Sequence, residues 1–182
     1  MNEQELRNLM YTAQLPRKGE AFSIRYPRGQ GVMPHWRTPF EEIKVGTGRK
    51  LSEGEDLALL TLGHIGNYAV EVCNKLAKQG ILIGHYDLRF AKPLDEEMLH
   101  QVFKKYRKII TVEDGCLQGG VGSAVLEFMA DHQYNAEVKR LGIPDRIVEH
   151  GEQLELHRET GFDPDAIEQT VLLMLESAKQ LA

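Results

Sequence analysis

The sequence contains few of the residues that mark secreted, membrane or metal-binding proteins. It has two cysteines in 182 residues, and because Cys73 falls on the apolar face of a predicted helix, we expect reduced thiols rather than a disulfide. No apolar run approaches the length of a membrane span, and the first residues, Met-Asn-Glu-Gln-Glu-Leu-Arg, are no signal peptide. The seven histidines occur singly, without H-x-x-x-H or C-x-x-C spacing, which gives metal binding little support. These absences favour a cytoplasmic protein.

A strong excess of charge of one sign is also missing. The chain carries 22 Lys and Arg against 27 Asp and Glu, a net charge of -5, which argues against a general nucleic-acid or membrane-surface role. Its hydrophobic content of 42% is ordinary for a globular protein. The length supports one domain of ordinary size with residues to spare.

The N-terminal residues predict one helix and one strand. Residues 2–12 place Leu6, Leu9 and Met10 at helical spacing. Residues 21–26 alternate apolar and polar side chains as a strand does. These two elements are too few to enclose a hydrophobic core of their own.

This imbalance predicts how the chain is divided. Residues 1–30 are expected to be the end of a preceding domain. Residues 31–40 contain two prolines and follow neither a helix period nor a strand period, so they are interpreted as a linker. Residues 41–182 are then expected to form a domain of their own.

From residue 41 onward, short apolar runs alternate with helical patterns. Leu57–Leu62 is continuously apolar and is expected to be covered on both faces. The alternation predicts an α/β fold, with a three-layer, mostly parallel five-stranded sheet, helices on both faces and one antiparallel edge strand. The predicted strands are residues 43–45 (the edge), 57–62, 81–88, 109–112 and 137–141. The predicted helices are residues 65–77, 95–106, one beginning at residue 123, 152–160 and 164–182.

Several residues mark the ends of these helices. Asp95 and Asp163 are expected N-caps, and Pro164 suits the first helical position. Gly161 is expected to end the helix before it. The last helix would turn these apolar residues to one side: Ile167, Val171, Met174, Ala178 and Leu181.

A glycine-rich turn follows the strand at residues 109–112. Gly120-Val-Gly122 invites a dinucleotide-binding interpretation. The third glycine of that motif would fall at Val125, however, and no acidic residue ends the next strand at the required distance. We therefore favour a structural role, in which glycine permits a tight turn and lets the helix approach the sheet closely.

Two acidic residues stand at the start of this turn. Glu113 and Asp114 are adjacent, so in a strand their side chains point to opposite faces. They are therefore no ready acid/base pair. We expect one of them to cap a helix or to pair with a basic group such as Arg89 or Lys92.

The turn also contains a cysteine. Cys116 near a helix N-terminus could be a nucleophile of lowered pKa. No neighbour in the sequence is an obvious base, and His64 would have to arrive from another turn. A packed turn cysteine is the favoured interpretation.

The basic segment Arg25-Tyr-Pro-Arg28-Gly29 is a candidate anion site. It places two guanidinium groups close together at the end of a predicted strand, beside a glycine. Arginine offers a bidentate fork to phosphate or carboxylate. The alternative is that both side chains are simply solvated.

Five segments resemble one enzyme family when taken in order: Arg25–Gly29, Asp87–Asp95, Thr111–Asp114, Gly119–Ser123 and Leu141–Asp145. Together they closely resemble the C-terminal part of the 1-deoxy-D-xylulose-5-phosphate synthases, and the resemblance covers nearly the whole chain. Asp-Leu-Arg-Phe-x-Lys-Pro-Leu-Asp and Arg-Tyr-Pro-Arg-Gly are its specific parts. The glycine-rich turn alone is shared more loosely with transketolases and the β subunits of 2-oxoacid dehydrogenases.

The resemblance implies a role in a larger enzyme. These homodimeric synthases use thiamine diphosphate and magnesium to condense pyruvate with glyceraldehyde 3-phosphate, giving 1-deoxy-D-xylulose 5-phosphate and carbon dioxide for isoprenoid and thiamine synthesis. By resemblance, residues 1–30 would end the pyrimidine-binding domain, and residues 41–182 would be the transketolase C-terminal domain. Arg28 matches the family arginine that helps to hold the substrate phosphate.

The motifs that hold the cofactor in the family are missing here. No Gly-Asp-Gly occurs in the sequence, and the family's cofactor glutamate would lie upstream of Met1. We therefore expect no catalytic, cofactor-binding or metal-binding residue in the chain, no thiamine diphosphate bound to it, and no activity without the missing N-terminal and middle domains. The alternatives are a stand-alone dimerisation or interaction domain of the same fold, or the equivalent domain of a transketolase or 2-oxoacid dehydrogenase β subunit.

Overall fold

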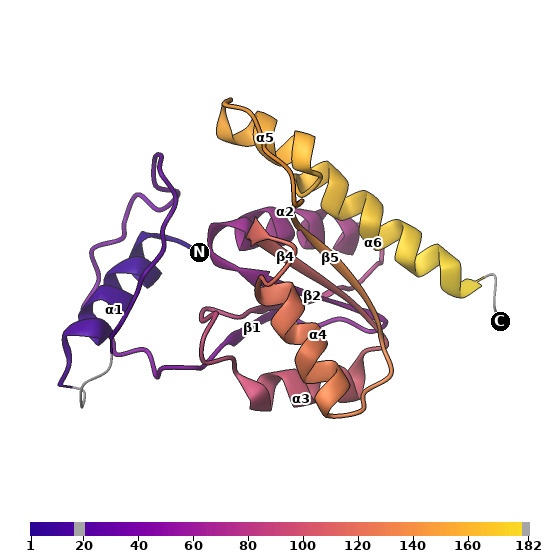
Figure 1. Cartoon of the computed structure of the whole chain (residues 1–182), viewed down its shortest axis with the longest axis horizontal. Coiled ribbons are helices and arrows are strands. Elements are labelled where there is room, and N and C mark those ends of the chain that lie inside the picture. The colour runs from indigo at the N-terminus through magenta and orange to yellow at the C-terminus, as the bar shows by residue number, and fades with distance from the viewer. Residues whose placement is uncertain (17–20, 180–182) are drawn as a thin grey trace.

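The computed structural model describes residues 1–16 and 21–179, with side chains to residue 176. A central five-stranded sheet has helices on both of its faces, and α1 lies to one side with the irregular segments that follow it (Figure 1). The strands are β1 (Arg49–Ser52), β2 (Leu57–Leu62), β3 (Gly84–Asp87), β4 (Lys108–Cys116) and β5 (Glu137–Ile143). The helices are α1 (Glu3–Gln14), α2 (Gly66–Ala77), α3 (Glu96–Lys105), α4 (Val121–Asp131), α5 (Gln153–Thr160) and α6 (Pro164–Lys179), with a 3-10 turn at Gly63–Ile65.

The strands follow the order β1-β3-β2-β4-β5. β2 pairs in parallel with β3 and β4, and β4 pairs in parallel with β5. β1 runs antiparallel to β3 at one edge. The predicted fold class, a mostly parallel five-stranded sheet with one antiparallel edge strand, is confirmed.

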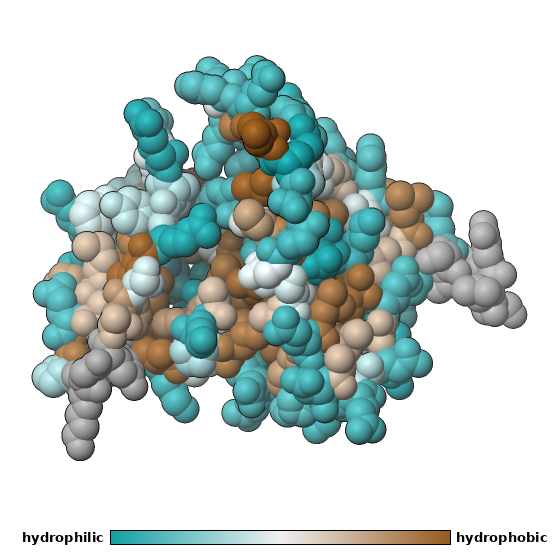
Figure 2. Space-filling view, in the orientation of Figure 1, coloured by the Kyte–Doolittle hydropathy of each residue, from teal (hydrophilic) through white to brown (hydrophobic). Residues whose placement is uncertain are grey.

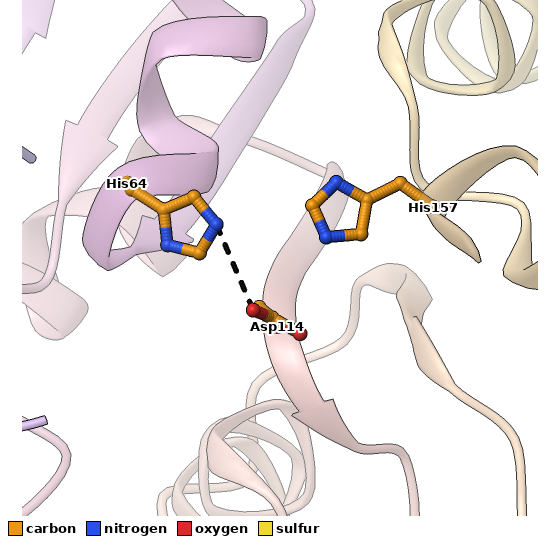
Figure 3. A group of neighbouring side chains, drawn as sticks. All are labelled: His64, Asp114 and His157. Carbon is orange, nitrogen blue, oxygen red and sulfur yellow. Dashed lines mark ion pairs between the residues drawn. The ribbon is translucent and has the colours of Figure 1, made fainter. Parts of the chain in front are cut away.

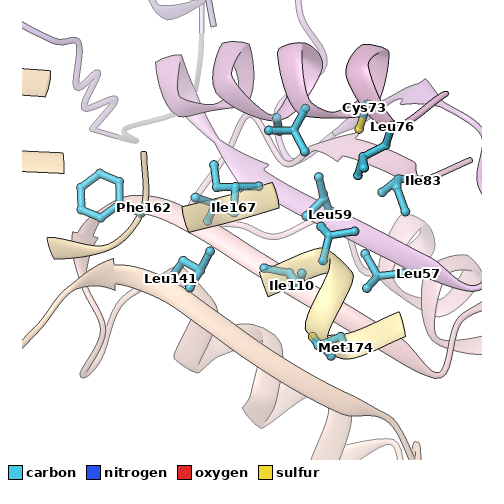
Figure 4. Packing of buried hydrophobic residues seen from close by; sticks show 14 of the residues in the cluster. Leu57, Leu59, Cys73, Leu76, Ile83, Ile110, Leu141, Phe162, Ile167 and Met174 are labelled. Atoms are coloured by element: carbon cyan, nitrogen blue, oxygen red, sulfur yellow. The ribbon is translucent and has the colours of Figure 1, made fainter. Parts of the chain in front are cut away.

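Each face of the sheet carries its own hydrophobic core. Leu57 and Leu59 of β2 pack with α2 and α6, whereas Ala58 and Leu60 pack with α3 and α4. Figure 4 shows the first of these clusters, with side chains of strands and helices meeting between the layers. Because alternate residues of a strand point to opposite faces, a strand covered on both sides must be apolar throughout, as predicted for β2.

Most strand boundaries differ from the prediction: β3 is shorter (Gly84–Asp87, predicted 81–88), β5 is longer (Glu137–Ile143, predicted 137–141), and β1 and β4 differ as follows. The antiparallel edge strand is β1 at Arg49–Ser52, not residues 43–45. Ile43 is buried instead against α1, where its N–H donates to Thr12 Oγ1 at 2.8 Å. β4 also continues four residues beyond Val112 to Cys116, across an irregularity in its pairing with β5. These errors arose because strand pairing depends on backbone hydrogen bonds, which side-chain patterns do not report.

The predicted strand at residues 21–26 is wrong. This segment has no regular secondary structure and is not part of the described sheet. An alternating sequence forms a strand only where a neighbouring backbone satisfies its N–H and C=O groups.

The predicted helix at residues 2–12 is confirmed as α1, but its apolar stripe is not its buried face. α1 buries Glu5, Asn8 and Thr12, while Met10 is exposed. Asn8 and Thr12 accept hydrogen bonds from the N–H groups of Glu41 at 3.2 Å and Ile43 at 2.8 Å, whereas Glu5 binds Arg49 and Arg89.

The helix-end signals were correct. Asp95 caps α3 by accepting from the N–H of Met98 at 2.9 Å, and Asp163 accepts from the N–H of Ala166 at 3.3 Å. Gly161 ends α5 with a φ of 76°. The predicted face positions Ala178 and Leu181 lie outside the side chains that the structure describes.

On the face seen in Figure 2, polar side chains line the upper and lower margins, and apolar side chains gather between them. Among the described residues, no helix has both the length and the apolar character needed to cross a membrane. Cys73 and Cys116 are both free thiols, as expected, but Cys116 is exposed, so the prediction of a packed turn cysteine was wrong.

Candidate functional site

The carboxyl ends of β2 and β4 meet at the point where the strand order reverses. The chain leaves β2 through α2 on one face of the sheet, and leaves β4 through α4 on the other. In open α/β sheets, the crevice between two such strands is the usual place for ligands. This edge of the sheet is therefore the first place to look for a site.

Glu113 lies at this edge and caps α4. Its two carboxylate oxygens accept from the N–H groups of Val121 at 2.9 Å and Gly122 at 2.8 Å. The contact leaves no room for a side chain at Gly120, because a Cβ there would lie 2.1 Å from the carbonyl oxygen of Cys116 and 2.6 Å from the Glu113 oxygens. The prediction that one member of the acidic pair caps a helix is confirmed, and the glycine has the structural role proposed for it.

Asp114 points the other way, toward two histidines. Its Oδ2 lies 3.6 Å from Nε2 of His64, which comes from the turn after β2. His157 of α5 completes the group, and one ligand atom from each of the three residues lies within 4.8 Å of the others. Figure 3 shows both imidazole rings facing the Asp114 carboxylate. Three segments far apart in the sequence thus converge on one point of the sheet edge.

Burial lowers the pKa of both histidines. Loss of solvation is the largest cause for His64 and for His157, and it outweighs the attraction of the nearby Asp114 carboxylate. His157 is buried, and its Nδ1 lies 3.2 Å from the hydroxyl of Tyr68 on α2. A neutral imidazole has a lone pair on one ring nitrogen. The group can therefore accept a proton or a cation at that nitrogen.

Arg89, the alternative partner considered for the acidic pair, binds a different carboxylate. Arg89 binds Glu5 of α1 in a bidentate pair, with Nε to Oε2 and Nη2 to Oε1 both at 2.9 Å. Arg49 of β1 joins the same Glu5 and also contacts Asp87 at 3.0 Å. The sequence could not show this pairing, because the partners come from distant segments of the chain.

This ion-pair cluster accounts for part of the motif at residues 87–95. Asp87 accepts from the N–H of Arg89 at 3.1 Å, and Asp95 accepts from the N–H of Gly48 at 2.8 Å as well as capping α3. Asp87 and Asp95, at the two ends of the motif, hold neighbouring loops together, so their role is structural.

Arg25 and Arg28, the predicted anion site, are exposed in a segment without regular structure. Within the described part of the chain neither makes an ion pair, so both guanidinium groups are available to a partner or ligand. Cys116 is exposed as well, and His64 pairs with Asp114. The structure does not bring Arg28 into the group at the sheet edge.

Sequence reasoning missed the group of His64, Asp114 and His157, because it searched for short metal-binding spacings. A usable signal existed for two of its members. His64 and Asp114 follow two strands, and the carboxyl ends of adjacent parallel strands meet at one edge. No pattern in the sequence places α5, and hence His157, at that edge.

Comparison with known families agrees with this fold. The model of the transketolase C-terminal domain matches residues 46–167, about two thirds of the chain. The chain belongs to the transketolase C-terminal domain family. A solved structure of a split-gene transketolase, an inactive β4 tetramer, superposes with a TM-score of 0.66 at 27% identity, covering 74% of this chain and 43% of that one. The match begins three residues before β1 and ends within α6.

Curated relatives extend the similarity to almost the whole sequence. The 1-deoxy-D-xylulose-5-phosphate synthase of Cytophaga hutchinsonii is 69% identical over 171 residues, which are 94% of this chain and 27% of the relative. That of Bacteroides thetaiotaomicron is 55% identical over 177 residues, 97% of this chain and 27% of the relative. The resemblance predicted from the motifs is confirmed, and the chain spans about a quarter of the length of the relatives it matches.

Proposed function

We propose that this chain acts as the C-terminal domain of a thiamine-diphosphate-dependent synthase, which condenses pyruvate with glyceraldehyde 3-phosphate to 1-deoxy-D-xylulose 5-phosphate and carbon dioxide. The main support for this proposal is the 69% identity to one such synthase over 94% of the chain. The similarity includes residues outside the transketolase C-terminal match at 46–167. A domain shared loosely among thiamine enzymes would not explain similarity to one synthase along the whole sequence.

In this role the N-terminal residues connect the domain to the rest of the enzyme. Residues 1–30 would end the pyrimidine-binding domain, and residues 31–40 would be the linker. The Glu5–Arg89 pair supports this, because it fastens α1 to the loop after β3. α1 turns polar residues toward this contact and leaves Met10 exposed, as expected if another domain or the second subunit of a homodimer covers the opposite side.

The residues present do not fit the cofactor. The sequence contains no Gly-Asp-Gly motif of the kind that holds the diphosphate through magnesium in this family. Thiamine diphosphate and Mg²⁺ would therefore be held by other domains of the synthase. The chain alone is expected to be inactive and to give no heat of binding when titrated with thiamine diphosphate and Mg²⁺. Saturable, magnesium-dependent heat at stoichiometric ratio would contradict this part of the proposal.

Arg28 is the substrate contact proposed for the chain. Its guanidinium group is exposed and makes no ion pair with a described residue, so it is free to bind the phosphate of glyceraldehyde 3-phosphate. Arginine binds phosphate through two parallel charge-assisted hydrogen bonds. The rest of the phosphate site would come from the other domains.

A domain exchange tests the proposal. The matching segment of the Cytophaga hutchinsonii synthase is replaced by this chain, and formation of 1-deoxy-D-xylulose 5-phosphate is measured with thiamine diphosphate and Mg²⁺. We expect activity within about tenfold of the parent, because most substitutions away from buried or paired groups change stability little. In the matched control, the same segment is replaced by the corresponding part of the split-gene transketolase, and this chimera should not catalyse the reaction. A folded, dimeric chimera with this chain but no activity would overturn the proposal.

One observation favours a second candidate. One structural neighbour is a split-gene transketolase described as an inactive β4 tetramer. The present chain could likewise be a separate subunit that assembles with copies of itself. Sedimentation of the chain alone separates the two: a stable oligomer at micromolar concentration favours the subunit, and a monomer favours the covalently linked domain.

A further inference from the structure

We propose that His64, Asp114 and His157 form a binding site for one divalent transition-metal ion, with Zn²⁺ as its representative. The site would join the turn after β2, the end of β4 and helix α5. In the proposed synthase, magnesium and thiamine diphosphate would be held by the other domains. The positions and the chemistry of these three side chains suit a metal ion.

The distances suit a small cation. Zn²⁺ binds imidazole nitrogen and carboxylate oxygen at about 2.0–2.2 Å, which in a tetrahedral site separates neighbouring donor atoms by about 3.4 Å. The His64 Nε2 to Asp114 Oδ2 distance is 3.6 Å. All three donor atoms lie within 4.8 Å of one another, so modest side-chain rotations bring the remaining pairs into range. Asp114 and His64 have room for such rotations, since their side chains are 32% and 22% exposed.

A neighbouring side chain orients His157. The hydroxyl of Tyr68 lies 3.2 Å from Nδ1 of His157. With the proton on Nδ1, the ring donates to the Tyr68 oxygen and its other nitrogen has a free lone pair. Figure 3 shows His157 turning one ring nitrogen toward Asp114. Metal-binding histidines usually have such a partner on the second nitrogen, which fixes both the tautomer and the ring orientation.

Two carboxylates attract a cation to the site, and the N-terminal ammonium of the chain opposes them at His64. Asp114 carries one negative charge, and the buried Asp163 adds a second close to His157. The nearest cation on α5, Arg158, lies 3.7 Å from Asp163 and is largely exposed. Gln153 approaches His64 Nε2 at 3.3 Å from the solvent side, where its exposed amide can move aside for an incoming ion.

The donor set selects the class of metal. Two imidazoles and one carboxylate suit Zn²⁺ and its transition-metal neighbours, whereas Mg²⁺ and Ca²⁺ prefer sites built entirely from oxygen. Three protein ligands also leave at least one coordination position for water or another ligand, as in open zinc sites. Mg²⁺ should therefore bind this site far more weakly than Zn²⁺.

Titration of the chain with Zn²⁺ after removal of metals with a chelator tests the proposal. We expect one Zn²⁺ per chain, a rise in thermal midpoint with Zn²⁺ but not with Mg²⁺, and a visible spectrum typical of coordinated nitrogen when Co²⁺ replaces Zn²⁺. Asp114→Asn and His157→Gln should each weaken binding by roughly 100-fold or more, and Tyr68→Phe by about tenfold. The matched control His150→Gln removes an exposed histidine and should bind like the parent.

Two results would overturn the site. One is the absence of stoichiometric Zn²⁺ binding by the folded parent chain. The other is binding that survives Asp114→Asn, a partly exposed position where the variant should still fold. Circular dichroism of each variant separates loss of the site from loss of the fold. The assay measures metal on the chain and not synthase activity, so its failure leaves the proposed function untouched, and failure of the domain exchange leaves the metal site untouched.

Discussion

Glu5 and Arg89, which lie 84 positions apart in the chain, form a bidentate ion pair with both N–O distances at 2.9 Å. Glu5 is buried in α1, and Arg89 has a left-handed backbone with a φ of 57°, which is uncommon outside glycine. The pair attaches the N-terminal helix to the loop after β3. Two predictions concern contacts of this kind, in which a carboxylate holds one segment on another.

Replacing Glu5 by Gln should loosen α1 from the sheet. The variant leaves Arg89 and Arg49 without their shared counter-charge, and breaking a partly buried pair should cost about 2 kcal/mol of local stability. Hydrogen exchange of α1 amides should therefore speed up by about 30-fold, while exchange in β2 and β4 stays unchanged. The exposed Gln14→Ala on the same helix is the control. Unchanged α1 exchange in the Glu5 variant would show that other contacts hold the helix.

Replacing Glu113 by Ala should destabilise α4. The change removes a buried carboxylate that accepts two backbone N–H groups at the helix N-terminus, and loss of such a cap costs about 1–2 kcal/mol. The midpoint of urea unfolding should fall without a change in slope. Glu127→Ala, at an exposed position of the same helix, should have little effect. Equal shifts in the two variants would contradict the capping role.

Stability should fall as the pH drops from about 6.5 to 4, in part because of His85. Burial, assisted by the nearby Arg49, lowers the pKa of this histidine from 6.5 to about 4. As the pH falls, the unfolded chain therefore binds the proton before the folded chain does. The contribution of neutral His85 to the free energy of unfolding is fully present above pH 6.5, decreases between pH 6.5 and 4, and is lost below pH 4. The free energy of unfolding lost through this titration is about 3 kcal/mol.

The variant His85→Gln isolates this contribution. Gln can still hydrogen-bond to Thr61, whose Oγ1 lies 2.8 Å from His85 Nε2. Urea unfolding at a series of pH values should show a smaller loss of stability for His85→Gln than for the parent between pH 6.5 and 4. The exposed His150→Gln should keep the parent's profile. Parallel profiles for parent and His85→Gln would rule out the titration of His85.

Arg28 should affect one substrate and not the other. In the chimeric synthase, Arg28→Ala should raise the Michaelis constant for glyceraldehyde 3-phosphate by about 10–100-fold, because a charge-assisted bond to phosphate contributes about 1.5–3 kcal/mol. The constant for pyruvate, which has no phosphate, should stay the same. Arg25→Ala is the matched control in the same segment. An unchanged constant for the phosphorylated aldehyde would remove the assignment.

Local signals predicted most of the sheet domain. The continuous apolar run at Leu57–Leu62 became a strand buried on both faces, and Asp95 and Gly161 marked helix ends at the correct residues. These features depend on neighbours within a few positions in the chain. The strand prediction for residues 21–26 was wrong, because the segment alternates apolar and polar side chains but joins no strand of the described sheet.

The sheet-edge group shows the limit of such signals. His64 and Asp114 could have been placed together from the parallel pairing of β2 with β4. His157 could not, because it reaches the edge only through the packing of α5 after β5. The same holds for Glu5, whose partners on β1 and beyond β3 are set by the docking of α1.

The sequence by itself determined the fold class, the family and the helix ends of this protein, because hydrophobic periodicity, capping residues and family motifs are local properties of the chain. Only the tertiary structure decided which charged side chains meet. Ion pairs and potential metal ligands interact over a few ångströms in space, whatever their separation in sequence. That is why Glu5 with Arg89, and Asp114 with His64 and His157, became visible only once the strands and helices were in place.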